Sequence, residues 1–231
     1  MKKLFEKHET LICMLLIILY IIINSYCIQN FGITDYRSTI INTVFSSALL
    51  AFIINLNGLS YYGLTKVSNP PKYLYFIPLL VIISVNLWSG ININNTPGEI
   101  IFHILTMFNI GFIEEIIFRG FLFKMLDKDN LKSAIAISSI TFGIGHIVNL
   151  FNGADFIPTL MQIGYAISIG YLFVIIFHKS KSLIPCILAH ALNNALSIFN
   201  IENTVSSYIA PVFLMIAPLC YAIYINKVVE E

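Results

Sequence analysis

The chain has 231 residues, of which 58% are hydrophobic and only 11% are charged, and its mean hydropathy is +0.84. Soluble domains carry about 25% charged residues, so the composition excludes an ordinary soluble protein and indicates an integral membrane protein. The net charge is +1 and there is no basic cluster, which argues against nucleic-acid binding. The four cysteines form no CxxC pair, so the sequence predicts neither a cysteine zinc site nor a disulfide framework.

Apolar runs of nearly the length needed to cross a bilayer, about 20 residues, follow one another along the chain. The first run follows Met1-Lys-Lys but lacks an Ala-x-Ala cleavage pattern, so we expect a retained membrane anchor rather than a signal peptide. Breaks rich in Asn, Gly and Pro separate the runs. The pattern predicts eight helices near residues 11–28, 39–56, 73–88, 99–126, 132–151, 157–178, 182–201 and 205–225.

The basic residues support this count and set the orientation. With the N-terminus inside, every basic residue except Arg37 and Arg119 falls in a predicted inner segment, as the positive-inside rule requires. We therefore predict an all-α polytopic membrane protein with about eight transmembrane helices and both termini cytoplasmic. The composition, rich in Ile, Asn and Lys, favours a bacterial plasma membrane as its location, with the lipid bilayer as its surroundings.

The fourth predicted helix carries ionisable residues at membrane depth. Glu114, Glu115 and Arg119 interrupt a run that is otherwise apolar from Ile100 to Leu126. Ionisable groups inside a span are costly and usually functional. Glu115 and Arg119 are four residues apart and can pair on one helical face. Glu114 points about 100° away. We expect a supporting Glu115–Arg119 pair and a free Glu114 that faces a cavity.

Two further spans carry polar residues at matching depth. His146 lies in the fifth predicted helix, and His190 and Asn194 share one face of the seventh. Helical rise places Glu114, His146 and His190 about 7 to 12 Å inside the cytoplasmic boundary. Asn193 is the nearest alternative to Asn194. His103, outside any motif, is expected to be an interhelical hydrogen-bond partner.

Close packing is expected around these residues. Phe142 precedes His146 by one helical turn and is expected to pack where the fourth and fifth helices meet. Small residues allow transmembrane helices to approach closely. We expect this role for Gly111, Gly120, Gly143 and Gly145, between the fourth and fifth helices.

A carboxylate, two imidazoles and a carboxamide in a low-dielectric cavity suit the attack of water on a carbonyl. Glu114 has the chemistry of a general base, and His190 with Asn194 could donate to a developing oxyanion. Zinc is the alternative, because a Glu and two His are ligand types of some catalytic zinc sites. No H-E-x-x-H motif and no nucleophilic Ser or Cys motif is present. No cofactor is therefore assigned from the sequence, with zinc at Glu114, His146 and His190 left open.

Three motifs together resemble those of the CPBP family, the CAAX-prenyl-endopeptidase and bacteriocin-processing (Abi) membrane proteases. They are Glu114-Glu115-x-x-x-Arg119, Phe142-x-x-x-His146 and His190-x-x-x-Asn194. The resemblance implies an eight-helix intramembrane endopeptidase, of glutamic or metallo type, in one membrane domain. It places the catalytic core at 98–201, N-terminal helices at 1–97, and the last helix and tail at 202–231. It also implies water activation by Glu114 and His146, and an oxyanion hole at His190 and Asn194, supported by Glu115, Arg119 and Phe142.

The expected activity is hydrolysis of a peptide bond near the cytoplasmic membrane face. The partner would be a CAAX-like peptide, a bacteriocin or leader peptide, or a membrane protein, and the sequence gives no oligomeric state. The alternative is a non-catalytic bacteriocin-immunity or scaffold protein that retains the motifs. A proton-coupled transporter ranks third, because the sequence has neither repeated halves nor broken midplane helices.

Overall fold

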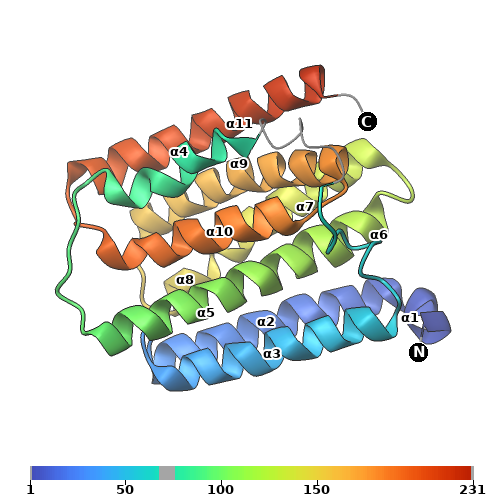
Figure 1. The fold of residues 1–231 in the computed structure, drawn as a ribbon, viewed down its shortest axis with the longest axis horizontal. Coiled ribbons are helices and arrows are strands. Elements are labelled where there is room, and N and C mark those ends of the chain that lie inside the picture. Colours follow the sequence, from blue (N-terminus) through green and yellow to red (C-terminus); the bar gives the residue numbers. More distant parts are fainter. Residues whose placement is uncertain (1, 68–75, 230–231) are drawn as a thin grey trace.

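The computed structural model describes residues 2–67 and 76–229, and the described chain is a bundle of helices (Figure 1). Six helical stretches are long and apolar enough to cross a membrane. This confirms the all-α polytopic fold. The elements are α1 (Lys2–Lys7), α2 (Glu9–Asn30), α3 (Tyr36–Asn55), α4 (Leu79–Ser84), η2 (Val85–Leu87), α5 (Pro97–Glu115), η3 (Ile116–Phe123), α6 (Lys124–Leu126), α7 (Leu131–Gly145), α8 (Val148–Phe151), α9 (Phe156–Ser180), α10 (Ile184–Leu196), η4 (Ser197–Phe199), η5 (Val205–Ile209) and α11 (Ala210–Val228).

One of the eight predicted spans is shorter than a full crossing, and another lies partly outside the described residues. The predicted helix at 182–201 is an apolar stretch from Ile184 to Phe199. The predicted helix at 73–88 begins outside the described residues, and its described helical part is α4 with η2, residues 79–87. The described parts of both segments pack against each other, and Asn86 and Asn193 join them by hydrogen bonds.

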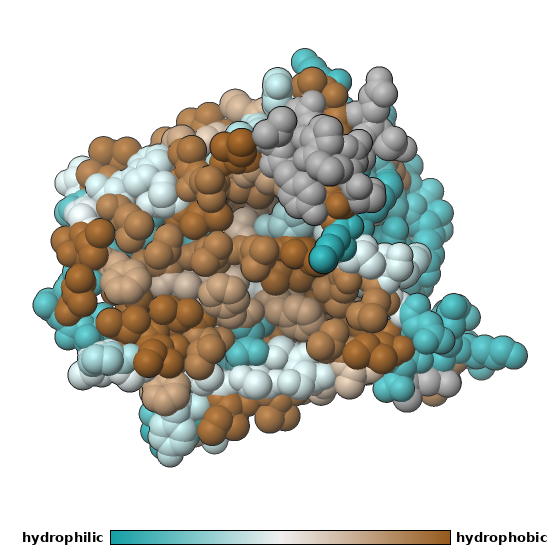
Figure 2. Space-filling model, viewed as in Figure 1, coloured by the Kyte–Doolittle hydropathy of each residue, from teal (hydrophilic) through white to brown (hydrophobic). Residues whose placement is uncertain are grey.

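The two ends of the described chain lie at one end of the bundle, and the predicted cytoplasmic location of that end stays a prediction. The start of α2 and the end of α11 lie at the same end of the bundle, next to the turn between α6 and α7 (Figure 1). Hydrophilic side chains gather at that end, and apolar side chains cover much of the remaining face (Figure 2). On α2, Leu15, Ile18 and Ile22 are more than half exposed, as lipid-facing side chains would be. We refer to the end of the bundle that carries both chain termini as the lysine-rich end.

Two helices that carry the motifs, α5 and α10, touch through backbone. A Cβ on Gly111 would lie 2.9 Å from the amide nitrogen of Ala191 and 3.0 Å from its Cα. Further along the same contact, Nε2 of His103 lies 3.2 Å from the carbonyl oxygen of Asn194. The prediction that His103 is an interhelical hydrogen-bond partner is therefore confirmed. Both contacts lie on the N-terminal side of the glutamates and fix the position of α10 against α5.

The glycines were expected to bring α5 and α7 together, and this expectation is wrong. Gly111 meets α10, whereas Gly143 meets α9, where a Cβ would lie 2.9 Å from the carbonyl oxygen of Ile163. Added Cβ atoms on Gly120 would meet only ordinary contacts, and on Gly145 nothing within 4 Å. Sequence shows that a glycine permits close approach, but it does not identify the helix that approaches.

The helix that carries the glutamates changes its winding directly after them. Residues Ile116–Phe123 form a π-helix, η3, and all eight are buried. π-helical turns bond residue i to i+5 and are frequent at functional sites. The wider turn begins directly after Glu115, and it carries Arg119. Uniform α-helical spacing did not predict it.

We expect Gly111→Ala to destabilise the bundle and to weaken any activity that needs α5 and α10 in register. The new methyl group would meet the Ala191 backbone, which cannot rotate away as a side chain could. Gly98→Ala is the matched control on the same helix, because nothing lies within 4 Å of its added Cβ. Thermal unfolding in lipid-containing micelles should show a lower melting temperature for Gly111→Ala only. Equal melting temperatures would contradict the assigned contact.

Candidate active site

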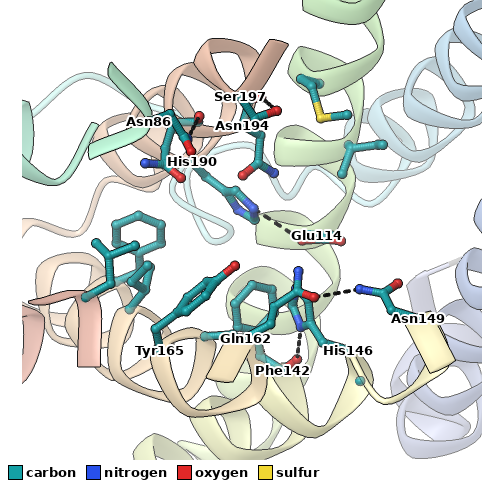
Figure 3. Close-up of a pocket in the computed structure, with 18 of the residues that line it drawn as sticks. Asn86, Glu114, Phe142, His146, Asn149, Gln162, Tyr165, His190, Asn194 and Ser197 are labelled. Atoms are coloured by element: carbon teal, nitrogen blue, oxygen red, sulfur yellow. Dashed lines mark hydrogen bonds and ion pairs between the residues drawn. The ribbon is translucent and has the colours of Figure 1, made fainter. Parts of the chain in front are cut away.

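The motif residues meet at one cavity. The glutamates end α5, His146 caps α7, and His190 and Asn194 lie one turn apart on α10. A cavity of about 370 Å³ is lined by Glu114, His146, His190 and Asn194 (Figure 3). Phe142 also lines it, whereas Glu115 and Arg119 lie behind it with no exposed surface. All seven residues proposed from the sequence therefore belong to this cavity or to its supporting layer.

Glu115 joins two partners. Its Oε1 accepts a hydrogen bond from Nη1 of Arg119 at 3.0 Å and from Nδ1 of His190 at 2.8 Å. The pairing of Glu115 with Arg119 confirms the helical spacing. The bond to His190 was not predicted, and it changes the role of Glu115. Rather than only neutralising an arginine, the carboxylate orients an imidazole that lines the cavity.

Glu114 is the carboxylate that faces the cavity, but it is not free. Its Oε1 accepts a hydrogen bond from the hydroxyl of Tyr20, which comes from α2. Its Oε2 lies 3.3 Å from Nε2 of His190. Glu114 therefore faces the cavity and meets His190 as expected, whereas its bond from Tyr20 was not predicted. Each carboxylate oxygen retains a second lone pair, so a water molecule can still be held.

His190 lies between two carboxylates, and this geometry limits its protonation. Carboxylate oxygens accept hydrogen bonds, so Nδ1 carries the hydrogen that Glu115 receives. Lone pairs on Nε2 of His190 and Oε2 of Glu114 would repel each other at 3.3 Å. One proton must therefore lie on one of these two atoms. The pair is arranged to pass that proton between a base and an acid.

The two ring nitrogens of His146 have different surroundings. Its Nδ1 lies 3.1 Å from the carbonyl oxygen of Phe142. A carbonyl oxygen can only accept, so Nδ1 carries a hydrogen and Nε2 of the neutral ring has a lone pair. Figure 3 shows the ring at the wall of the cavity, with this bond directed away from its centre. His146 can thus accept a hydrogen bond from water in the cavity.

Phe142 is the aromatic centre of the site. Its ring makes edge contacts with the rings of His146 and His190, at centroid distances of 5.3 and 5.8 Å. On its face, the guanidinium carbon of Arg119 lies 4.0 Å from the centroid. Nε and Nη2 of Arg119 have no hydrogen-bond partner among the described residues. The ring face therefore supplies part of what solvation would give this buried cation.

Helix α9 leaves the space in which Arg119 stacks on Phe142. A Cβ on Gly170 would lie 3.2 Å from Nη2 of Arg119 and 3.3 Å from the ring of Phe142. Such contacts are tight, so any larger residue would displace the guanidinium or the ring. Gly170 was not among the predicted site residues. It belongs to no motif, and its position in a long apolar helix carries no signal in the sequence.

The side chains of Asn193 and Asn194 differ in their hydrogen bonding. The side-chain nitrogen of Asn193 donates to the carbonyl oxygen of Ile82 at 2.9 Å. In the described chain, the carboxamide of Asn194 makes no hydrogen bond, and it lies beside the His190 ring, toward the cavity (Figure 3). The carboxamide available to a ligand is thus that of Asn194, which favours the predicted residue over its alternative.

The cavity extends away from the lysine-rich end. From Glu114 its lining follows α10 to Ser197 and reaches Ser206, near the start of α11. These residues lie toward the end of the bundle opposite the chain termini (Figure 1). The depth estimate placed the site near the cytoplasmic face, and the extent of the cavity does not favour this. Tilt and the short α10 make a count of residues a poor measure of depth.

The residues proposed as zinc ligands, Glu114, His146 and His190, are not arranged around a common position for a metal ion. Among the described residues, no group of three or more His, Cys, Asp or Glu side chains is placed to hold a metal ion. Nδ1 of His190 is bonded to Glu115, and one oxygen of Glu114 is bonded to Tyr20. Nε2 of His190 faces Oε2 of Glu114 directly. In this arrangement, the residues named for zinc do not fit a zinc site.

Two tyrosines at the cavity were missed. Tyr20 contacts Glu114, and the hydroxyl of Tyr165 points into the cavity from α9 (Figure 3). A polar side chain within a long aliphatic run is a weak signal for Tyr20, since Leu11 to Ile23 is otherwise almost wholly apolar. Tyrosine is common in membrane helices. Only the fold shows that α2 brings this one to the glutamate.

The comparisons with known proteins agree with these motifs. Residues 94–196 match the family model described as "Type II CAAX prenyl endopeptidase Rce1-like". Every candidate residue assigned from the sequence falls within the matched stretch. No curated protein and no solved structure matched the chain. Residues 94–196 therefore match an Rce1-like type II CAAX prenyl endopeptidase domain, which is consistent with a CPBP family intramembrane protease.

Proposed function

We propose that this protein is an intramembrane endopeptidase of the glutamic type. The observation that carries the proposal is the linked set Tyr20–Glu114–His190–Glu115–Arg119 at the wall of a buried cavity. This set provides a carboxylate, a proton partner for it, and a fixed tautomer. The Rce1-like domain supports CAAX-type endopeptidase activity in general. The substrate would be a CAAX-like peptide, a bacteriocin or leader peptide, or a membrane protein.

In the first step, Glu114 and His146 hold a water molecule at the carbonyl of the scissile bond. The water oxygen bonds to the carbonyl carbon while its proton passes to Oε of Glu114. Nε2 of His146 accepts the other hydrogen of the water, because Nδ1 is held by Phe142. Two fixed acceptors orient the oxygen lone pair toward the carbon. Holding the water molecule in this orientation beside the carbonyl carbon raises the rate of attack.

In the second step, the negative charge on the former carbonyl oxygen is stabilised and the bond breaks. The Asn194 carboxamide donates to the oxyanion from α10. His190 delivers the proton on its Nε2 to the leaving nitrogen, and the proton taken by Glu114 then replaces it across their contact. The C–N bond breaks and gives a free amine and a new carboxyl group. Glu115 holds His190 throughout.

Reconstituted in phosphatidylcholine vesicles, the purified protein should cleave quenched peptides with an apolar, prenylated C-terminal segment. We expect activity to survive incubation with EDTA and 1,10-phenanthroline, because Glu114 accepts the proton without a metal. Metal analysis of the active sample gives the independent readout. Activity lost with chelator and restored by zinc would contradict the glutamate mechanism. A bacteriocin-immunity protein without catalysis would instead protect cells and cleave no peptide, with protection unchanged by His190→Ala.

A further inference from the structure

Helix α2 lies outside the matched stretch of residues 94–196, yet it forms one wall of the cavity. Four of its side chains line that cavity: Tyr20, Ile21, Asn24 and Ile28. Tyr20 is only 5% exposed, and its hydroxyl donates to Oε1 of Glu114. A buried phenol hydroxyl needs a hydrogen-bond partner. Here that partner is the carboxylate proposed as the general base.

Two polar contacts hold α2 in the register that brings its tyrosine to the cavity. Near the start of the helix, the carboxylate of Glu9 pairs with Nζ of Lys128, in the turn that precedes α7. Near its end, Nε2 of Gln29 donates to Oδ1 of Asn152 at 2.9 Å, directly after α8. Both contacts flank the segment from α7 to α8, which carries His146. Helix α2 is therefore positioned against the segment that supplies the second acceptor for water.

The two carboxylate oxygens of Glu114 face different partners. Oε1 receives the hydrogen of the Tyr20 hydroxyl, whereas Oε2 lies 3.3 Å from Nε2 of His190. A protonated carboxyl group has one hydroxyl oxygen, which donates, and one carbonyl oxygen, which is the better acceptor. The bond from Tyr20 thus favours Oε1 as the carbonyl oxygen and leaves the proton on Oε2. From Oε2, a proton can pass directly to His190.

We infer that Tyr20 is a positioning residue of the peptidase reaction, which directs a proton of the attacking water to Oε2 of Glu114. The inference rests on the proposed function and adds to it a role for a helix outside residues 94–196. As the water oxygen bonds to the carbonyl carbon, one O–H bond of the water breaks and an O–H bond forms at Oε2. Once His190 has given its Nε2 proton to the leaving nitrogen, the proton on Oε2 already faces the position to be refilled. Tyr20 keeps its own proton throughout.

Tyr20→Phe removes the hydroxyl and keeps the ring. Either oxygen of Glu114 can then take the proton, and a proton on Oε1 reaches His190 only after the carboxyl group has rotated. We expect kcat to fall by about 10- to 100-fold, the range for one hydrogen bond to a charged group. KM for the quenched, prenylated peptide in phosphatidylcholine vesicles should change by less than about threefold, because the lost bond is to Glu114 and not to the peptide.

The solvent deuterium isotope effect on kcat distinguishes direction of the proton from a structural role of Tyr20. Transfer of the proton between Glu114 and His190 would limit the rate in Tyr20→Phe, so its isotope effect should exceed that of the wild type. A variant that only folds less well would have fewer active molecules and the wild-type isotope effect. A lower kcat with an unchanged isotope effect, or an unchanged kcat, would overturn the inference.

Tyr26→Phe is the matched control. It makes the same substitution on α2, at a tyrosine that is 52% exposed and is not among the residues that line the cavity. Its kcat, KM and isotope effect should equal those of the wild type. An equal loss of kcat in both variants would assign the effect to α2 as a whole and contradict the inference. No cleavage by the wild type would overturn the proposed function itself, whereas wild-type cleavage that Tyr20→Phe leaves unaltered would overturn only the inference.

Discussion

Replacing Glu114 with glutamine is expected to lower the rate of peptide cleavage by about 10²- to 10⁴-fold, the usual contribution of a general base. Glutamine has the same shape and keeps an oxygen that can accept from Tyr20. It cannot take a proton from water, and it cannot pass one across the 3.3 Å contact to His190. The measurement is kcat/KM for cleavage of the quenched, prenylated peptide by the protein in phosphatidylcholine vesicles. Wild-type activity in Glu114→Gln would remove the glutamate mechanism.

Two controls separate loss of chemistry from loss of fold. Glu99→Gln changes a carboxylate on the same helix, where Glu99 completes the capping box with Thr96 at the N-terminus of α5. Glutamine serves in such a capping box, so activity should be unchanged. Melting temperature should also be close to that of the wild type in both variants. A folded, inactive Glu114→Gln beside an active Glu99→Gln is the expected pattern.

Hydropathy predicted most of the fold because the membrane imposes it. Among the described residues, six of the eight expected segments are helices long enough to cross, and hydrophilic side chains gather at the end of the bundle that carries both chain termini (Figure 2). Segment length failed for the predicted helix at 182–201, which is an apolar helical stretch only from Ile184 to Phe199. Asn193 on this stretch donates a hydrogen bond to Ile82 of α4. The sequence carries the apolar character of such a segment but not its neighbours.

Local spacing predicted contacts within a helix and not those between helices. Glu115 and Arg119 pair at 3.0 Å, as a separation of four residues allows. The bonds from His190 to Glu115 and from Tyr20 to Glu114 join residues 75 and 94 positions apart. They depend on how α2 and α10 lie against α5. Motif resemblance assembled the residues correctly, but it assigned Glu115 a smaller role than its two partners indicate.

The periodicity of apolar residues could not predict the π-helix. Its eight residues are apolar except Arg119, so an α-helix and a π-helix would give the same apolar pattern. What distinguishes them is the packing of Arg119 against Phe142, with its guanidinium 4.0 Å from the ring centroid. That contact needs the space beside Gly170 on α9. Winding here follows tertiary contacts, which a single sequence does not display.

Replacing Arg119 with methionine is expected to reduce the free energy of unfolding by about 3–5 kcal/mol, the cost of leaving a buried charge without its partner. Arg119 and Glu115 have no exposed side-chain surface. Without the guanidinium, the Glu115 carboxylate keeps only His190 as a partner. Methionine fills much of the same volume, so the loss comes from charge and not from a cavity. Denaturant titration in mixed micelles measures the change.

The double variant Glu115→Gln/Arg119→Met decides whether the loss is electrostatic. Removing both charges leaves no uncompensated ion, and a neutral, well-packed pair costs little compared with the ion pair. The double variant should therefore be more stable than Arg119→Met alone, although it contains one more substitution. Arg37→Met is the surface control, since Arg37 pairs with Asp35 at 2.9 Å but is about half exposed, at 49%. Water solvates both of those charges when the pair is broken, so its unfolding should be almost unchanged. Equal stability of the single and double Arg119 variants would instead assign the role of Arg119 to its packing on Phe142.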